Sequence, residues 1–178
     1  MRAMMDACIL YPTVLREILI AAAGAGHFTP LWSPRILEEW ARAAARTGDQ
    51  AVARAEIALL TDGWPQANIL HDPADEETLS LPDPGDLHVL AAAVAGQADT
   101  ILTVNLRDFP GRTLARHGIS PRAPDSLLVE LHAEAPDSIA EIVDVVRIRT
   151  EEISGRDQPL RPLLKRAGLP RLGKALCA

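Results

Sequence analysis

Acidic side chains stand at several points of this chain where a strand is expected to end or a helix to begin. An open α/β sheet gathers its ligands at such positions. Several ionised carboxylates cannot sit together unless cations offset their repulsion, and Mg²⁺ or Mn²⁺ suits an all-oxygen cluster better than zinc. The pattern therefore predicts a metal-dependent site for phosphoryl transfer. The residues concerned are Asp6, Glu38, Glu39, Asp83, Asp86 and Asp108, together with the amide of Asn105.

Some of these positions also have a purely structural interpretation. Asp83 precedes a proline, a pattern typical of a helix N-cap, whereas Asp86 falls in the first helical turn, where the helix dipole keeps a carboxylate ionised. Glu38 can pair with Arg42 four residues later, which favours a solvated surface charge. Glu39 lies nearer the apolar edge of the same helix. Periodicity alone does not separate the two glutamates.

The elements that must position these residues alternate short β-like runs with helical runs, which predicts an α/β fold with a mainly parallel sheet. One helix signal opens with Ser33 as N-cap and Pro34 as first helical residue and ends before Gly48. The expected strands span residues 3–10, 28–32, 68–71 and 100–104. The expected helices span residues 12–25, 34–47, 50–62 after Asp49 as N-cap, 86–97 and 136–153, and the chain stays helical from residue 124 onward.

Four segments in this order resemble the acidic motifs of PIN-domain nucleases, most closely those of the VapC-type ribonuclease toxins. They are DACILYP at residues 6–12, EEW at 38–40, DPGDLHVLAAA at 83–93 and TVNLRDFP at 103–110. The resemblance covers roughly residues 1–125. It implies a PIN-like three-layer fold with a central, mainly parallel sheet flanked by helices, and a C-terminal helical appendage.

By this resemblance four carboxylates form the catalytic acidic quartet: Asp6, Glu39, Asp86 and Asp108. Three of them, Asp6, Asp86 and Asp108, would bind the metal, and Glu39 would hold a water or assist proton transfer. Asn105 and Thr103 take supporting positions. Arg107 and Arg112 can contact phosphate, or they are simply solvated.

The resemblance further implies a Mg²⁺- or Mn²⁺-dependent endoribonuclease that acts on RNA, dimerises with itself and is held inactive by a protein antitoxin. A housekeeping PIN nuclease in RNA processing, without an antitoxin, is one alternative. A non-catalytic PIN-like binding scaffold is another, because Cys8 stands where the family usually has Asn, Ser or Thr, and a thiol makes a weaker hydrogen bond.

Composition excludes several other classes. The 178 residues suffice for a single sizeable core, and lysine first appears at Lys165, so the body lacks the lysine that response-regulator receivers and haloacid-dehalogenase-like phosphatases need near their aspartate. No P-loop and no G-x-S-x-G sequence is present. Apolar stretches are too short for a membrane span, so we expect a cytoplasmic protein whose two cysteines, Cys8 and Cys177, are reduced thiols.

Charge is divided unevenly along the chain. Residues 1–146 contain 10 basic and 21 acidic residues, a balance of −11, whereas residues 147–178 contain 8 and 3, a balance of +5. We expect a catalytic domain at residues 1–125 and a basic helical extension at 126–178 that packs on or next to it. Prolines in the tail predict short helices rather than one long helix. The tail would contact RNA, dock an antitoxin, or form a solvated surface.

Overall fold

The computed structural model describes residues 1–177, and its contacts divide the chain into two compact units. The first unit contains Met1–Tyr11 and Phe28–Arg122, and the second contains Pro12–His27 and Ala123–Ala178. The functional division expected at residue 125, into a catalytic domain and an extension, stays a prediction.

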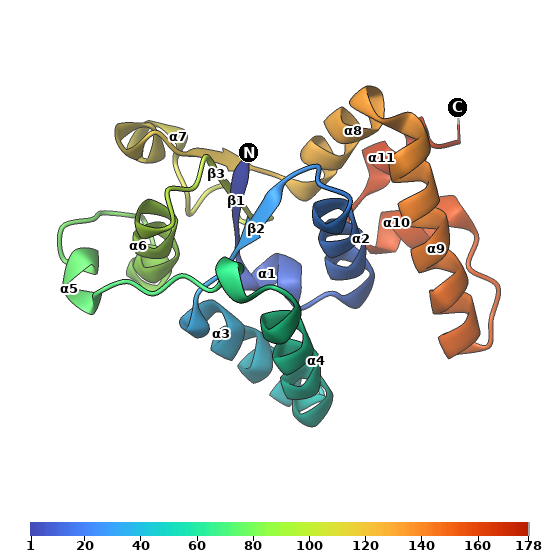
Figure 1. Cartoon of the computed structure of the whole chain (residues 1–178), viewed down its shortest axis with the longest axis horizontal. Helices are drawn as coiled ribbons and strands as arrows, with labels where there is room; N and C mark the ends of the chain where they lie inside the picture. Colours follow the sequence, from blue (N-terminus) through green and yellow to red (C-terminus); the bar gives the residue numbers. More distant parts are fainter. Residues whose placement is uncertain (178) are drawn as a thin grey trace. The chain divides into compact units, whose positions relative to one another are not determined.

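A four-stranded parallel sheet lies at the centre of the first unit (Figure 1). Its strands are β1 (Arg2–Met5), β2 (Thr29–Leu31), β3 (Thr100–Leu102) and β4 (Ser120–Arg122), in the order β2-β1-β3-β4. Met4 of β1 pairs with Leu31 of β2 on one side and Ile101 of β3 on the other, and all three side chains are fully buried. Apolar runs without alternation are typical of parallel strands that are covered on both faces. The predicted α/β fold with a parallel sheet flanked by helices is confirmed.

Helices α3 and α6 carry two of the acidic motifs. Helix α3 (Pro34–Ala45) begins where the Ser33 hydroxyl accepts a hydrogen bond from the Ile36 amide at 3.3 Å, as the capping pattern predicts. Helix α6 (Leu87–Ala95) packs against β1 and β3. The other helices of this unit are α1 (Ala7–Leu10), α4 (Gln50–Gly63), α5 (Pro73–Glu76) and α7 (Gly111–Leu114), with 3₁₀ turns η1 (Pro65–Ala67), η2 (Pro84–Asp86) and η3 (Ala115–His117).

The strand expected at residues 3–10 is wrong beyond Met5. The Asp6 amide donates to the Leu102 carbonyl at 3.1 Å, and the chain then turns directly into helix α1. The run after Asp6 is apolar but has only one β-branched residue, Ile9, so it suits a buried helical turn as well as a strand.

Two further expectations were wrong in detail. Residues 68–71 form only an isolated bridge, Asn68 to Trp32, before the chain leaves the sheet. Asp49 occupies the expected N-cap position of α4, but its side chain makes no capping hydrogen bond there, and its carboxylate accepts the Thr47 hydroxyl at 2.8 Å. Strand β4 was not expected, since Pro121 in its middle is unfavourable inside a sheet and is tolerated here on an edge strand.

The second unit is entirely helical across the described residues. It contains α2 (Thr13–Gly24), α8 (Pro124–Glu134), α9 (Pro136–Ser154), α10 (Leu160–Arg166) and α11 (Pro170–Ala175). The short helices predicted for the tail are confirmed. The Asp125 carboxylate accepts the amides of Arg171 and Leu172, each at 3.0 Å, which fixes the start of α11 to α8. None of the helices in residues 1–177 has the length and apolar character needed to cross a membrane.

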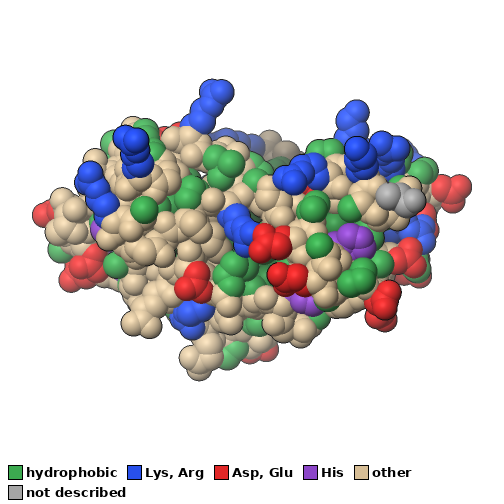
Figure 2. Space-filling view, turned by 90° about the horizontal axis from the view of Figure 1, so that it is seen from above, with side chains coloured by type: hydrophobic (Ala, Val, Ile, Leu, Met, Phe, Trp, Pro, Cys, Tyr) green, Lys and Arg blue, Asp and Glu red, His purple; other side chains and the backbone are tan. Residues whose placement is uncertain are grey.

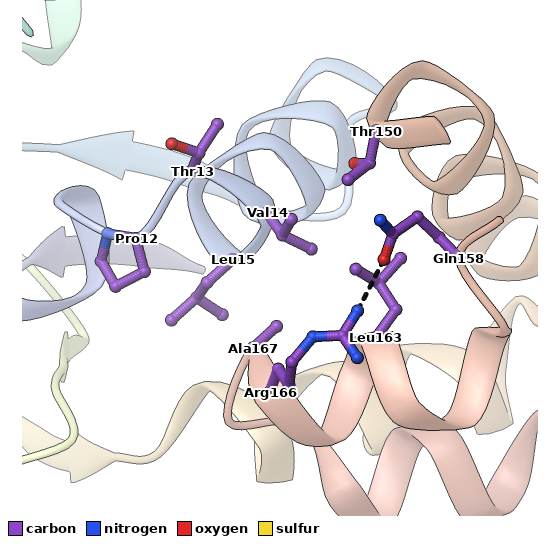
Figure 3. A pocket seen from close by; sticks show the side chains of 9 residues that line it. All are labelled: Pro12, Thr13, Val14, Leu15, Thr150, Gln158, Leu163, Arg166 and Ala167. Atoms are coloured by element: carbon purple, nitrogen blue, oxygen red, sulfur yellow. Dashed lines mark hydrogen bonds between the residues drawn. The ribbon is translucent and has the colours of Figure 1, made fainter. Parts of the chain in front are cut away.

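A pocket of about 340 Å³ opens in the second unit between the start of α2 and α10 (Figure 3). The Arg166 guanidinium at its rim donates to the Gln158 side-chain oxygen at 2.6 Å. Among the described residues, those that line this pocket include no acidic side chain and none of the acidic residues that the sequence motifs single out.

Candidate active site

The site lies where the sheet changes winding direction. From β1 the chain continues to β2 on one side, whereas β3 and β4 lie on the other, so the carboxyl ends of β1 and β3 flank the switch point. Open α/β sheets bind ligands in the crevice at such a point. Asp6 directly follows β1 and Thr103 directly follows β3, so the sheet itself brings these two residues together.

Asp6 is held by two donors. The Thr103 hydroxyl donates to Asp6 Oδ2 at 2.7 Å, and the Cys8 thiol donates to the same oxygen at 3.0 Å. The backbone N–H of Asn105 in turn donates to the Thr103 hydroxyl oxygen at 2.9 Å. Asp6 is only 6% exposed, so these bonds fix the orientation of its carboxylate. Thr103 therefore contacts the first aspartate of the motifs, and its supporting role in a reaction stays a prediction.

Cys8 acts here as a hydrogen-bond donor. Burial, and after it the charge of Asp6, raises the pKa of the Cys8 thiol to about 12. The thiol keeps its proton at neutral pH and donates it toward Asp6, while the Val104 amide donates to the sulfur at 3.4 Å. A residue that departs from the usual family pattern thus still makes a polar contact with the first aspartate.

Asp86 lies at the beginning of α6, and Asp83, three residues earlier, caps the turn that precedes the helix. The Asp83 carboxylate accepts the Gly85 amide at 2.8 Å, which confirms the predicted capping role. Burial is the main cause that raises the pKa of Asp86 to about 6, and the charges of Asp6, Asp83 and Asp108 act in the same direction. Asp6, Asp83 and Asp108 therefore lie near enough to Asp86 for their charges to act on its carboxylate.

Asp108 is positioned by a turn after β3. The Asp108 amide donates to the Asn105 carbonyl at 3.0 Å, which folds the loop back on itself. Arg107 and Asn105 in this turn are exposed, as is Arg112 at the start of α7. These side chains are free to meet a ligand in solvent, and their expected contacts with a substrate stay predictions.

The two glutamates on α3 face different partners. Glu38 is paired with Arg42 at 3.3 Å and with Arg54 of α4 at 3.1 Å, so the predicted surface pairing is confirmed. Glu39 Oε1 lies 2.8 Å from Nε2 of His88 on α6 and 3.9 Å from Arg35 Nε. Glu39 thus points toward the helix that begins at Asp86.

His88 of α6 is fully buried. Its contact with Glu39 was missed at the level of sequence. The available signal was its place two residues after Asp86, on an otherwise apolar helix. Charge from His88 opposes the upward shift in the pKa of Asp86, so the ring lies near both acidic residues.

The carboxylates of this site are ligands that suit a hard divalent cation, although the described side chains do not form a complete coordination shell. Within residues 1–177, no three or more His, Cys, Asp or Glu side chains are grouped tightly enough to hold a metal ion. The chemistry nevertheless fits, because Asp6, Asp86 and Asp108 offer only carboxylate oxygens, and a cation would relieve the repulsion that Asp86 experiences from the other two. Their assignment as metal ligands stays a prediction.

Comparison with known proteins gives one match. A family model described as PIN domain matches residues 2–107, more than half of the chain. The matched segment includes Asp6, Glu39 and Asp86 and ends one residue before Asp108. No curated protein and no solved structure matches the chain.

Proposed function

This chain belongs to the PIN-domain family, and we propose on that premise that it is a Mg²⁺- or Mn²⁺-dependent endoribonuclease. PIN domains are typically nucleases, that is, hydrolases of phosphodiester bonds. One observation carries the proposal: Asp6 follows β1, Asp108 lies in the turn after β3 and Asp86 lies at the start of α6, yet the charges of Asp6 and Asp108 both act on Asp86. A concentration of negative charge beside a sheet switch point is suited to a cation and its anionic substrate.

In this proposal Asp6, Asp86 and Asp108 hold the cation, which when bound lowers the pKa of a water molecule and offsets charge on the phosphate. Thr103 and Cys8 keep the Asp6 carboxylate in one orientation through their hydrogen bonds. Glu39 orients the attacking water and accepts its proton. Arg107, exposed beside Asp108, contacts a phosphate of the RNA.

We further propose that the protein is the toxin of a toxin–antitoxin pair. The support is the ordered set of motifs at residues 6–12, 38–40, 83–93 and 103–110, which resembles that of VapC-type toxins. A cytoplasmic setting, a homodimer and inhibition by a protein antitoxin belong to the same proposal. Expression of the chain should arrest growth, and co-expression of the neighbouring gene's product should relieve the arrest; growth without arrest favours a housekeeping nuclease.

A non-catalytic scaffold is the second candidate. It is favoured by the absence of a finished ligand shell within the described residues and by the thiol at position 8. Such a scaffold would bind nucleic acid or protein through the same fold without cleaving it.

RNA cleavage by the purified chain separates these candidates. We expect an internally labelled single-stranded RNA to be cut at internal phosphodiester bonds when Mn²⁺ or Mg²⁺ is present, and to stay intact in EDTA. Asp6→Asn should remove nearly all of this cleavage. Binding of RNA without cleavage at any metal concentration would contradict the nuclease and support the scaffold.

A further inference from the structure

His88 is an unusual residue for its surroundings. Its side chain is completely buried on α6, where the following residues Val89, Leu90 and Ala91 are also buried. Neither ring nitrogen has an aligned hydrogen-bond partner within residues 1–177, although Nε2 lies 2.8 Å from Glu39 Oε1. The contact is therefore a close polar approach whose direction departs from an ideal hydrogen bond. Burying an imidazole costs free energy that such a contact only partly offsets.

Other groups do not fix Glu39 as closely. Arg35 is 3.9 Å from Glu39, is half exposed, and lies nearer to Glu76 at 3.4 Å. Glu76 is itself held by His71 at 3.1 Å, so Arg35 is drawn toward α5. The Glu39 side chain is 34% exposed and would sample several rotamers without a buried partner.

We propose that His88 is a positioning residue that fixes the Glu39 carboxylate beside the start of α6. The inference rests on the proposed function, in which Glu39 serves the nuclease reaction. Through this contact α6 supplies Asp86 and also sets the direction of a carboxylate on α3. Glu38, one residue earlier, is held by Arg42 and Arg54 instead, which makes it a matched control.

The contact itself is tested in the metal-free protein. Proton–nitrogen NMR of the His88 ring should change strongly in Glu39→Gln and stay unchanged in Glu38→Gln. A double-mutant cycle of His88→Leu and Glu39→Gln, read by denaturant unfolding, should show coupling of about threefold or more in the unfolding equilibrium constant. Equal responses of the ring to both glutamate variants, or no coupling, would overturn the proposal. Neither the NMR comparison nor the double-mutant cycle depends on catalysis. A protein that does not cleave RNA would therefore refute the proposed function, while the contact between His88 and Glu39 could still be tested.

Kinetics test whether the contact positions Glu39 for reaction. His88→Leu fills the same space without a donor, and His88→Gln places an amide nitrogen near the position of Nε2. We expect His88→Leu to lower kcat by about tenfold or more with KM changed little, and His88→Gln to recover most of the loss. His88→Leu should add little to the loss caused by Glu39→Gln. An unchanged kcat in folded His88→Leu would contradict the positioning role, and if that variant does not fold, the NMR comparison decides.

Discussion

The thiol of Cys8 and the carboxylate of Asp6 share one polar network at the end of β1. Because the pKa of Cys8 is raised to about 12, the reactive thiolate is scarce at pH 8. Cys177 is exposed to solvent. Native protein treated with iodoacetamide at pH 8 should therefore be alkylated at Cys177 and spared at Cys8, as measured by mass spectrometry. Denatured protein should react at both, and rapid native labelling of Cys8 would contradict its protonated, buried state.

The same network predicts which residues can replace Cys8. Serine retains a donor toward Asp6, whereas alanine removes it and leaves the thiol's space empty. We expect Cys8→Ser to keep RNA cleavage within about threefold of the unmodified chain, and Cys8→Ala to lose about tenfold, since contacts that orient a ligand have effects of that size. Equal activity of the two variants would show that the donor is unimportant.

Asp86 gives a prediction on stability and pH. Its pKa is about 6 in the fold against an ordinary 3.8, so ionisation opposes folding. This opposition is absent below about pH 4 and complete above about pH 6. In EDTA, Asp86→Asn should therefore raise Tm at pH 8 by about 2–4 °C, which corresponds to about 1 kcal/mol after screening by solvent, and leave it unchanged below pH 4. Asp157→Asn, an exposed acid in a loop, is the control. A lower Tm for Asp86→Asn at pH 8 would indicate a structural role.

At the scale of elements, capping and periodicity predicted most of the fold. Ser33 and Pro34 marked the beginning of α3, and β-branched Thr100 and Ile101 marked β3. Strand β4 was not predicted, because a segment of three residues that includes a proline has almost no local pattern typical of a strand. The run after Asp6 was misassigned because a short apolar segment fits a strand and a buried helical turn equally well. Tertiary pairing, which decides both cases, is not encoded in local periodicity.

A pair of glycine substitutions, at Gly96 and Gly24, tests how closely the end of α6 packs against its neighbours. A Cβ at Gly96 would lie 3.0 Å from Ile69, 3.1 Å from the Ala92 carbonyl and 3.2 Å from Leu31, whereas one at Gly24 would meet nothing within 4 Å. Gly96→Ala should therefore lower the free energy of unfolding by about 1–3 kcal/mol. Gly24→Ala should leave it unchanged or raise it by up to about 1 kcal/mol. Denaturant unfolding measures both, and equal effects would contradict the packing around Gly96.

The acidic site shows a similar division between what sequence predicts and what only the fold reveals. Residue types and order indicated Asp6, Asp86 and Asp108, although the local pattern extended the first strand beyond its true end at Met5. The choice of Glu39 over Glu38 rested on a resemblance. In the structure Glu38 pairs with Arg42 and Arg54, whereas Glu39 approaches His88, which is 49 residues away in the sequence. The periodicity of a helix does not show contacts with residues that are far away in the sequence, so these contacts could not be predicted.

At the scale of the whole molecule, the basic residues of the tail, residues 147–178, lie on helices that pack within the second unit. Leu164, Leu169 and Leu172 are fully buried in the second unit, so removing the tail would expose apolar surface and disturb folding. The exposed cations Arg161, Lys165 and Lys174 can be changed without that damage. Basic side chains project from the surface in the view of Figure 2, interspersed with acidic ones.

These three cations allow a clean test of the tail. If they contact RNA, the variant Arg161→Gln/Lys165→Gln/Lys174→Gln should bind RNA more weakly, and the slope of log affinity against log salt should fall by about 2. Arg46→Gln/Arg116→Gln, two exposed cations of the first unit, serves as the control. Weakened antitoxin binding with unchanged RNA affinity would assign the tail to the antitoxin. No change in either would leave a solvated surface.

The central claim, that clustered carboxylates perform metal-dependent RNA cleavage, is tested most directly by a matched pair at the start of α6. Asp86 interacts with Asp6 and Asp108, whereas Asp83, three residues earlier, caps the turn through the Gly85 amide. Initial rates of RNA cleavage in Mn²⁺ should fall by at least about a hundredfold in Asp86→Asn, and by less than about threefold in Asp83→Asn. Equal rates for Asp86→Asn and the unmodified chain, or cleavage that persists in EDTA, would contradict the account.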